Sequence, residues 1–127
     1  MPTEKIYAGA KFEVRSWVDG GINVVMRFLE ELCKNGDSDG VRLNNLIMHT
    51  ADHGLRFNER HIRALGDGIY EFKAPNTCRI MFFYDKNKLI ICSHEFTGKR
   101  GNDDKFIKRQ LKTAEAVRTD YFKEKGE

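Results

Sequence analysis

The chain has 127 residues, of which 40% are hydrophobic and 32% are charged, a size and balance typical of one soluble globular domain. Its longest apolar runs, at residues 80–84 and 89–92, are far shorter than the roughly 20 residues that cross a bilayer, and no basic start leads into an apolar secretion signal. These features exclude the membrane and secreted classes and predict a cytoplasmic protein.

Cysteine usage agrees with that prediction. Cys33, Cys78 and Cys92 are odd in number and include no C-x-x-C pair. A disulfide framework or a thiolate zinc site is therefore not expected. Each cysteine lies within an apolar pattern, which predicts free thiols that are buried as small hydrophobic groups.

The net charge is only +3, but the basic excess is concentrated near the end of the chain. Residues 99–125 contain nine lysines and arginines against five acidic residues. Such an excess suits a phosphate-rich partner, and it equally suits the solvated face of a helix.

The first half of the chain predicts a strand followed by two helices. Polar and apolar residues alternate over residues 5–18, which is typical of a strand with one buried face, with Gly9 as a break or bulge. Apolar residues then recur at helical spacing over residues 22–33 and 41–53, ended by Gly36 and Gly54. We expect these helices to form an antiparallel pair that covers one face of a sheet.

The second half predicts three strands and a helix. Residues 69–73, 78–84 and 88–95 are the strands, separated by turn-forming segments, and the middle strand is expected to be central because Arg79 is the only charged residue in it. A helix over residues 103–123, capped by Asn102 or Asp103, carries an apolar stripe. The order predicts an α+β fold with a three-stranded antiparallel sheet, in a single domain over residues 1–127.

Three segments resemble the phage-derived Gp49-like, HigB-type toxins of the RelE/ParE superfamily. Residues 62–73, I-R-A-L-G-D-G-I-Y-E-F-K, resemble the L-x-x-G-L-Y-E-L-R segment of that family. Residues 78–84 resemble its Y-R-I-x-Y strand, and residues 93–96 with Lys99 and Arg100 resemble its L-H-x-F-x-K-K element.

The resemblance covers residues 10–123, so residues 1–9 are expected as an N-terminal extension. It departs from the family after Phe96, where the basic pair is displaced by one position and the T-x-K-T-P continuation is missing. The resemblance implies a RelE-like fold and the toxin of a type II toxin–antitoxin system.

The same resemblance implies an mRNA interferase, an endoribonuclease that cleaves messenger RNA in the ribosomal A site by 2′-hydroxyl attack, without metal or cofactor. Its partners would be the ribosome, messenger RNA and a cognate helix-turn-helix antitoxin. A homodimer and a toxin–antitoxin heterotetramer are both compatible with it. The alternatives are a ParE-like gyrase inhibitor and a module that only binds another protein.

This cleavage needs a base near the 2′-hydroxyl, positive charge on the phosphorane and an acid for the leaving oxygen. Arg79, whose guanidinium suits phosphate, and His94, which titrates near neutrality, are the leading candidates. Lys99, Arg100 and Tyr121 complete the expected catalytic set. Each main candidate has a structural alternative: an ion pair between Arg79 and Glu71, a hydrogen-bonded histidine at a strand end, and packing of Tyr121 on the core.

Six further basic residues are the expected RNA-binding set: Arg63, Lys73, Lys105, Lys108, Arg109 and Lys112. Phosphate contacts of this kind supply affinity rather than sequence choice. A solvated helix face is the alternative for the last four. His49 and His53 stand four residues apart, but without a third ligand at matching spacing we expect surface histidines and no metal site.

Overall fold

The protein is described here by a computed structural model, which covers residues 3–54, 61–74, 78–86, 88–97 and 104–125. The strands in these ranges are β1 (Thr3–Ala8), β2 (Glu13–Asp19), β3 (Ile22–Asn23), β4 (Ile62–Gly66), β5 (Ile69–Lys73), β6 (Cys78–Asp85) and β7 (Leu89–Thr97). The helices are α1 (Val24–Lys34), α2 (Ser38–His53) and α3 (Asp104–Glu124). The predicted α+β class is confirmed.

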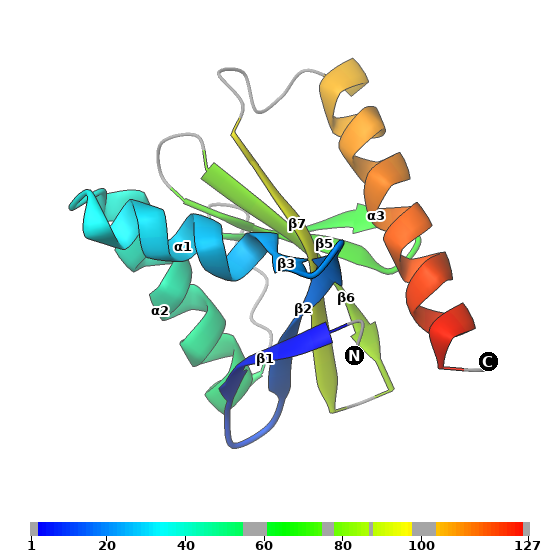
Figure 1. Cartoon of the computed structure of the whole chain (residues 1–127), viewed down its shortest axis with the longest axis horizontal. Helices are drawn as coiled ribbons and strands as arrows, with labels where there is room; N and C mark the ends of the chain where they lie inside the picture. Colours follow the sequence, from blue (N-terminus) through cyan, green and yellow to red (C-terminus); the bar gives the residue numbers. More distant parts are fainter. Residues whose placement is uncertain (1–2, 55–60, 75–77, 87, 98–103, 126–127) are drawn as a thin grey trace.

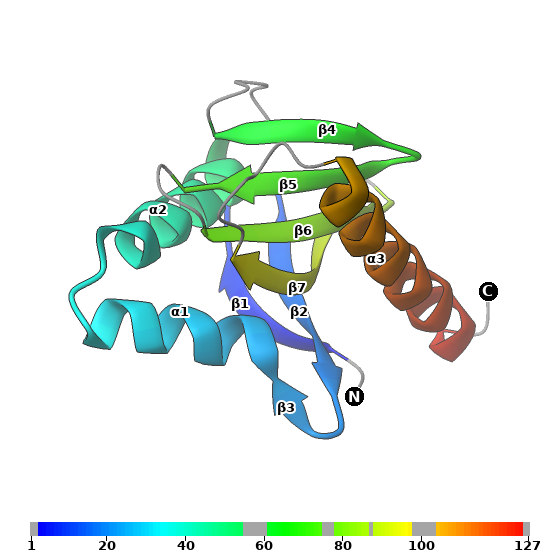
Figure 2. The same ribbon diagram turned by 90° about the horizontal axis from the view of Figure 1, so that it is seen from above.

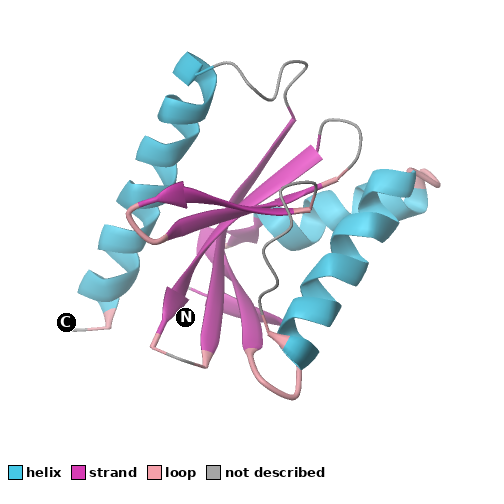
Figure 3. Ribbon diagram, turned by 180° about the vertical axis from the view of Figure 1, so that it is seen from behind, coloured by secondary structure: helices cyan, strands magenta, loops and turns pink. Residues whose placement is uncertain are grey.

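The described strands form one sheet in the order β1-β2-β7-β6-β5-β4, with β3 paired to β2. Neighbouring strands are antiparallel except β2 and β7, which run parallel. Helices α1 and α2 lie on one face of the sheet and α3 on the other (Figures 1 and 2). Figure 3 shows this arrangement from behind. The molecule therefore has three layers, with the sheet in the middle.

The prediction of a three-stranded sheet is wrong, because the sheet has 7 strands. Residues 5–18 form parts of two strands rather than one. The chain reverses after Gly9, whose added Cβ would lie 2.4 Å from the carbonyl carbon of Ala51. The amides of Lys11 and Phe12 donate to the Ala51 oxygen, each at 2.9 Å. The end of α2 thus holds the hairpin turn between β1 and β2.

Strand β4 was not expected. It pairs antiparallel with β5 across a turn at residues 66–68, where Gly66, Asp67 and Gly68 all have positive φ. Residues 3–8, expected as part of an N-terminal extension, form the edge strand β1 of the same sheet. Strand β6 lies between β5 and β7, so its predicted central position is confirmed.

Both faces of the sheet bury apolar side chains. On one face, Phe72, Ile80 and Phe82 pack with residues of α1 and α2. On the other, β-strand residues such as Met81 and Phe83 pack against α3. Strand alternation assigns each side chain of β6 to one of these layers, so even-numbered residues meet α1 and α2 and odd-numbered residues meet α3.

The cysteine prediction is partly confirmed. Cys78 and Cys92 are buried, and burial raises the pKa of the Cys92 thiol to about 12. Cys33 is exposed and lies in the last turn of α1. Among the described residues, no helix combines the length and apolar character needed to cross a membrane.

Candidate functional site

One row of side chains crosses four strands on the α3 face of the sheet. Arg63 of β4 is opposite Glu71 of β5, Glu71 is opposite Met81 of β6, and Met81 is opposite His94 of β7. Side chains that pair in this way project from the same face. Two strand spacings separate the Cα atoms of Glu71 and His94, which is roughly 10 Å.

The next row adds two more predicted residues to this face. Lys73 of β5 is opposite Arg79 of β6, which is opposite Phe96 of β7. Because strand residues two apart share a face, Arg79 lies diagonally between Glu71 and His94. The register therefore brings together four of the residues expected from the sequence, namely Arg63, Lys73, Arg79 and His94.

Glu71 connects two of these basic side chains. Its Oε1 atom lies 3.0 Å from Nη1 of Arg79 and 3.0 Å from Nη2 of Arg63. The exposed fractions of the side chains are 0% for Glu71, 7% for Arg79 and 28% for Arg63. The ion pair between Arg79 and Glu71, predicted as the structural alternative for Arg79, is confirmed. Arg63 is the member of this group that reaches solvent.

The charge state of Glu71 is set by opposing effects. Burial raises the pKa of its carboxyl, and the cations of Arg79, Arg63 and Lys73 lower it only in part, so the pKa remains above its ordinary value. The Oε2 atom is buried without a hydrogen-bond partner among the described residues. A buried carboxylate with one unsatisfied oxygen is costly to keep.

His94 is held by hydrogen bonds at both ring nitrogens. Its Nε2 lies 2.8 Å from Oε1 of Gln110 on α3, and its Nδ1 lies 2.9 Å from Oγ of Ser93. An amide oxygen can only accept, so Nε2 carries the hydrogen and Nδ1 of the neutral ring accepts from Ser93. Burial lowers the pKa of His94, against the smaller upward effect of the Gln110 bond. The ring is therefore neutral at pH 7, as a proton acceptor must be.

Helix α3 presents its predicted basic residues to solvent. Lys105, Lys108, Arg109 and Lys112 are exposed, and their spacing places them along one side of the helix. Phe106 packs on Phe96 instead, with ring centroids 5.6 Å apart. This exposure fits both interpretations made from the sequence, an RNA-binding surface and a solvated helix face.

Tyr121 lies away from this group. It is buried, and its hydroxyl donates to Oδ2 of Asp85, which also pairs with Lys125. Asp85 and Arg79 are six residues apart on β6, or about 20 Å along an extended strand. The structure thus shows the alternative predicted for Tyr121, which is packing on the core. Lys99 and Arg100 lie outside the described residues.

The model of the family described as "Phage derived protein Gp49-like (DUF891)" matches residues 30–119 of the chain. The chain belongs to this family. The Gp49-like resemblance read from the sequence is therefore confirmed, and the matched residues include Arg63, Glu71, Arg79 and His94. No curated protein matches the chain.

Two members of the site in this Gp49-like protein, Glu71 and Gln110, are not evident as site residues in its sequence. Glu71 appeared only as a partner of Arg79, although its place two residues before Lys73 in an alternating strand already puts both on one face. Gln110 left no signal, because its contact with His94 joins a helix to a strand across 16 residues of sequence.

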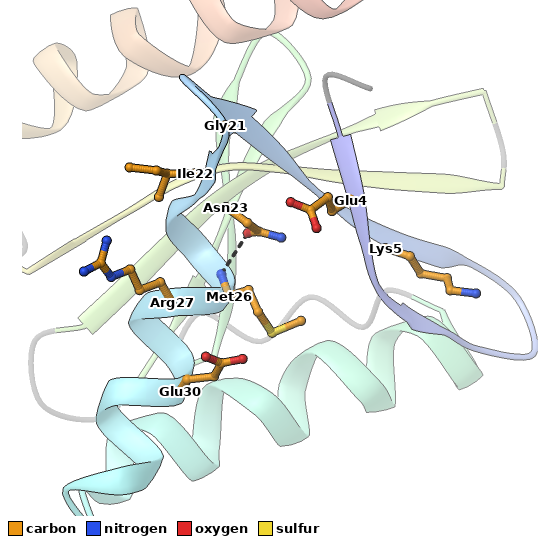
Figure 4. A pocket seen from close by; sticks show the side chains of 8 residues that line it. All are labelled: Glu4, Lys5, Gly21, Ile22, Asn23, Met26, Arg27 and Glu30. Atoms are coloured by element: carbon orange, nitrogen blue, oxygen red, sulfur yellow. Dashed lines mark hydrogen bonds between the residues drawn. The ribbon is translucent and has the colours of Figure 1, made fainter.

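A groove of about 480 Å³ lies elsewhere in the Gp49-like protein, between β1, β3 and the first turns of α1 (Figure 4). Its side chains include both charges, such as Glu4 and Arg27. The Asn23 side chain accepts a hydrogen bond from the Met26 amide at 3.0 Å and so caps α1. The groove therefore shows no concentration of one charge that would select a ligand.

The two histidines considered for metal binding, His49 and His53, are exposed on α2 with ring centroids 4.7 Å apart. In the part of the chain that the structure describes, no group of three or more His, Cys, Asp or Glu side chains is placed to hold a metal ion.

Proposed function

We propose that this Gp49-like protein is the toxin of a type II toxin–antitoxin system and cleaves messenger RNA on the ribosome. The observation that supports this proposal is the arrangement of Arg63, Arg79 and neutral His94 on one face of the sheet. Guanidinium groups and a proton acceptor on one surface are the parts that metal-independent RNA cleavage uses. A helix-turn-helix antitoxin would be the partner that restrains this activity.

The proposed reaction assigns a task to each group. When substrate displaces Gln110, the neutral His94 ring takes its other tautomer, with the hydrogen on Nδ1 donated to Oγ of Ser93. The freed Nε2 then accepts the proton of the ribose 2′-hydroxyl. The 2′-oxygen bonds to the adjacent phosphorus, and the bond from phosphorus to the 5′-oxygen breaks. The leaving 5′-oxygen takes a proton from solvent water, which leaves a 2′,3′-cyclic phosphate and a 5′-hydroxyl. Arg63 stabilises the charge that develops on the phosphoryl oxygens, with Arg79 behind it.

The exposed basic residues of α3 support the binding part of the proposal. Lys105, Lys108, Arg109 and Lys112 lie on the helix that contacts β7 through Gln110 and His94. Lysine and arginine side chains in such a row contact the phosphates of RNA irrespective of sequence. The RNA backbone would then run from α3 toward the sheet.

The test is induced expression in bacteria, with growth followed and RNA 5′ ends mapped. The proposal expects growth arrest with new ends inside translated codons, and no new ends when translation is blocked. Arg63→Ala and Arg79→Ala should both sharply reduce the new ends while leaving a measurable residue, and Arg42→Ala on the exposed side of α2 should leave them unchanged. Arrest with intact messages would contradict the nuclease.

A ParE-like gyrase inhibitor is the second candidate, because one observation counts against the nuclease. Arg79 is only 7% exposed and is paired with Glu71, so the guanidinium expected to act in cleavage is mostly covered. A supercoiling assay with purified gyrase separates the two functions. Inhibition at stoichiometric protein, without RNA cleavage, would support the second candidate.

A further inference from the structure

Glu71 occupies an unusual position for a carboxylate. It is completely buried, and cations approach it from three strands: Arg63 on β4, Lys73 on its own strand β5 and Arg79 on β6. Replacing buried ion pairs by apolar residues is often neutral or stabilising. A need for stability alone therefore does not explain a charged residue at this position.

The charge of Glu71 does not stabilise the fold at neutral pH. Its pKa stays above the ordinary value despite the cations beside it, which means that ionisation is harder in the folded chain than in the unfolded chain. The unsatisfied Oε2 atom adds to the cost. The effect of the carboxylate is instead to hold neighbouring side chains in a fixed position.

A single oxygen of Glu71 connects the two arginines. Nη2 of Arg63 and Nη1 of Arg79 both contact Oε1 at 3.0 Å, so the two guanidinium groups are held side by side. Like charges at that separation repel strongly when partly buried, and without the carboxylate Arg63, which is 28% exposed, is free to swing into solvent.

We infer that Glu71 is a positioning residue, which holds Arg63 beside Arg79 so that a phosphate meets two guanidinium groups in a fixed arrangement. This inference rests on the proposed function. Arg63 is the guanidinium that contacts the phosphate first, because it is the more exposed of the two. Arg79 adds charge from behind.

The main variant is Glu71→Gln, which keeps the size of the side chain and removes the charge. A misplacement of about 1 Å at a reacting centre costs about 10²-fold in rate, so kcat for ribosome-bound message should fall about 100-fold while KM stays within about threefold. Asp85→Asn is the matched control, since Asp85 is also buried and on the α3 face but lies at the other end of β6. Its kcat should equal that of the wild type.

A double-mutant cycle distinguishes positioning from a merely structural role. In an Arg63→Ala background, Glu71→Gln should change kcat less than about threefold, because the arginine that it positions is gone. Full additivity of the two losses would overturn the inference. If Glu71→Gln does not fold, judged by its thermal transition, Glu71→Asp replaces it, with a smaller loss of kcat expected and the same cycle applied.

A second measurement does not depend on activity. The side-chain NH signals of Arg63 and Arg79 in ¹⁵N NMR should shift and broaden in Glu71→Gln and stay unchanged in Asp85→Asn. Unchanged arginine signals in Glu71→Gln would overturn the inference even if the wild type cleaves RNA. A wild type that does not cleave RNA would contradict the proposed nuclease, and the NMR comparison would still decide whether Glu71 holds the arginine pair.

Discussion

Tyr121 of α3 donates its hydroxyl hydrogen to the buried carboxylate of Asp85 on β6, and this bond fastens the end of the last helix to the sheet. Lys125 pairs with the same carboxylate oxygen. The Tyr121 ring packs on Phe83, with centroids 5.7 Å apart. The contact explains why an aromatic residue near the end of the chain is buried far from the Glu71 group.

The first prediction concerns this bond. Tyr121→Phe keeps the packing and removes one donor from a buried acceptor, so the free energy of unfolding should fall by about 1–3 kcal/mol. RNA cleavage should remain at the wild-type rate. Urea denaturation and a cleavage assay on the same preparation measure both quantities. Loss of cleavage with unchanged stability would restore Tyr121 as a catalytic candidate.

The second prediction follows from the pKa of Asp85. Burial on its own raises it, but hydrogen bonds from Lys125 and Tyr121 outweigh burial and hold the pKa below its ordinary value of 3.8. The ionised carboxylate therefore contributes stability above pH 3.8, and this contribution is lost as the pH falls through the folded-state pKa. Unfolding measured between pH 2 and 6 should show a shallower acid loss in Asp85→Asn than in the wild type.

The third prediction has the opposite sign, at Glu71. Its folded-state pKa lies above the ordinary value of 4.5, so the folded chain binds the proton more tightly than the unfolded chain. The stability linked to Glu71 is present below pH 4.5 and is lost as the pH rises through the folded-state pKa. Glu71→Gln should remove this decline from the unfolding free energy. A decline of equal size in the variant would show that another group causes it.

The fourth prediction concerns His94. Burial holds its pKa below 6.5, so the neutral ring stabilises the fold above pH 6.5 and this stability is lost as the pH falls below that value. The His94 ring signals in NMR should titrate with a midpoint under 6.5. The wild type should lose more stability than His94→Gln on acidification from pH 7 to 5. Parallel curves for the two proteins would contradict the prediction.

The fifth prediction tests the basic side of α3. If Lys108 contacts an RNA phosphate, Lys108→Gln should weaken binding and reduce the slope of log K against log salt by about 0.7, the value for one contact to a single strand. Lys34→Gln is the control, because Lys34 is exposed in the last turn of α1, on the other side of the sheet. Equal slopes for the wild type and both variants would leave Lys108 on a solvated helix face.

Local periodicity in the sequence predicted much of the fold. The sequence predicts α1, α2 and α3 because the spacing of apolar residues is a property of each helix by itself. The predicted bounds of these helices differ from the observed bounds by a few residues. The first helix starts at Val24 rather than near residue 22, because residues 22 and 23 pair with β2. The alternation of β1 and β2 was also visible, but the reversal at Gly9 depends on the backbone of Ala51 in α2.

For the site, the sequence by itself determined that Arg79 stands alone among apolar residues of its strand and that the chain resembles the Gp49-like family. It also placed His94 in the last strand, although β7 continues past His94 to Thr97. Only the tertiary structure decided which residues meet. Arg63 and Arg79 contact the same oxygen of Glu71, and Gln110 forms a hydrogen bond with His94. Sheet register and helix docking bring these residues together although they are distant along the chain. Such contacts arise when separate elements bury their apolar faces against one another, and the spacing of residues within one element does not contain that information.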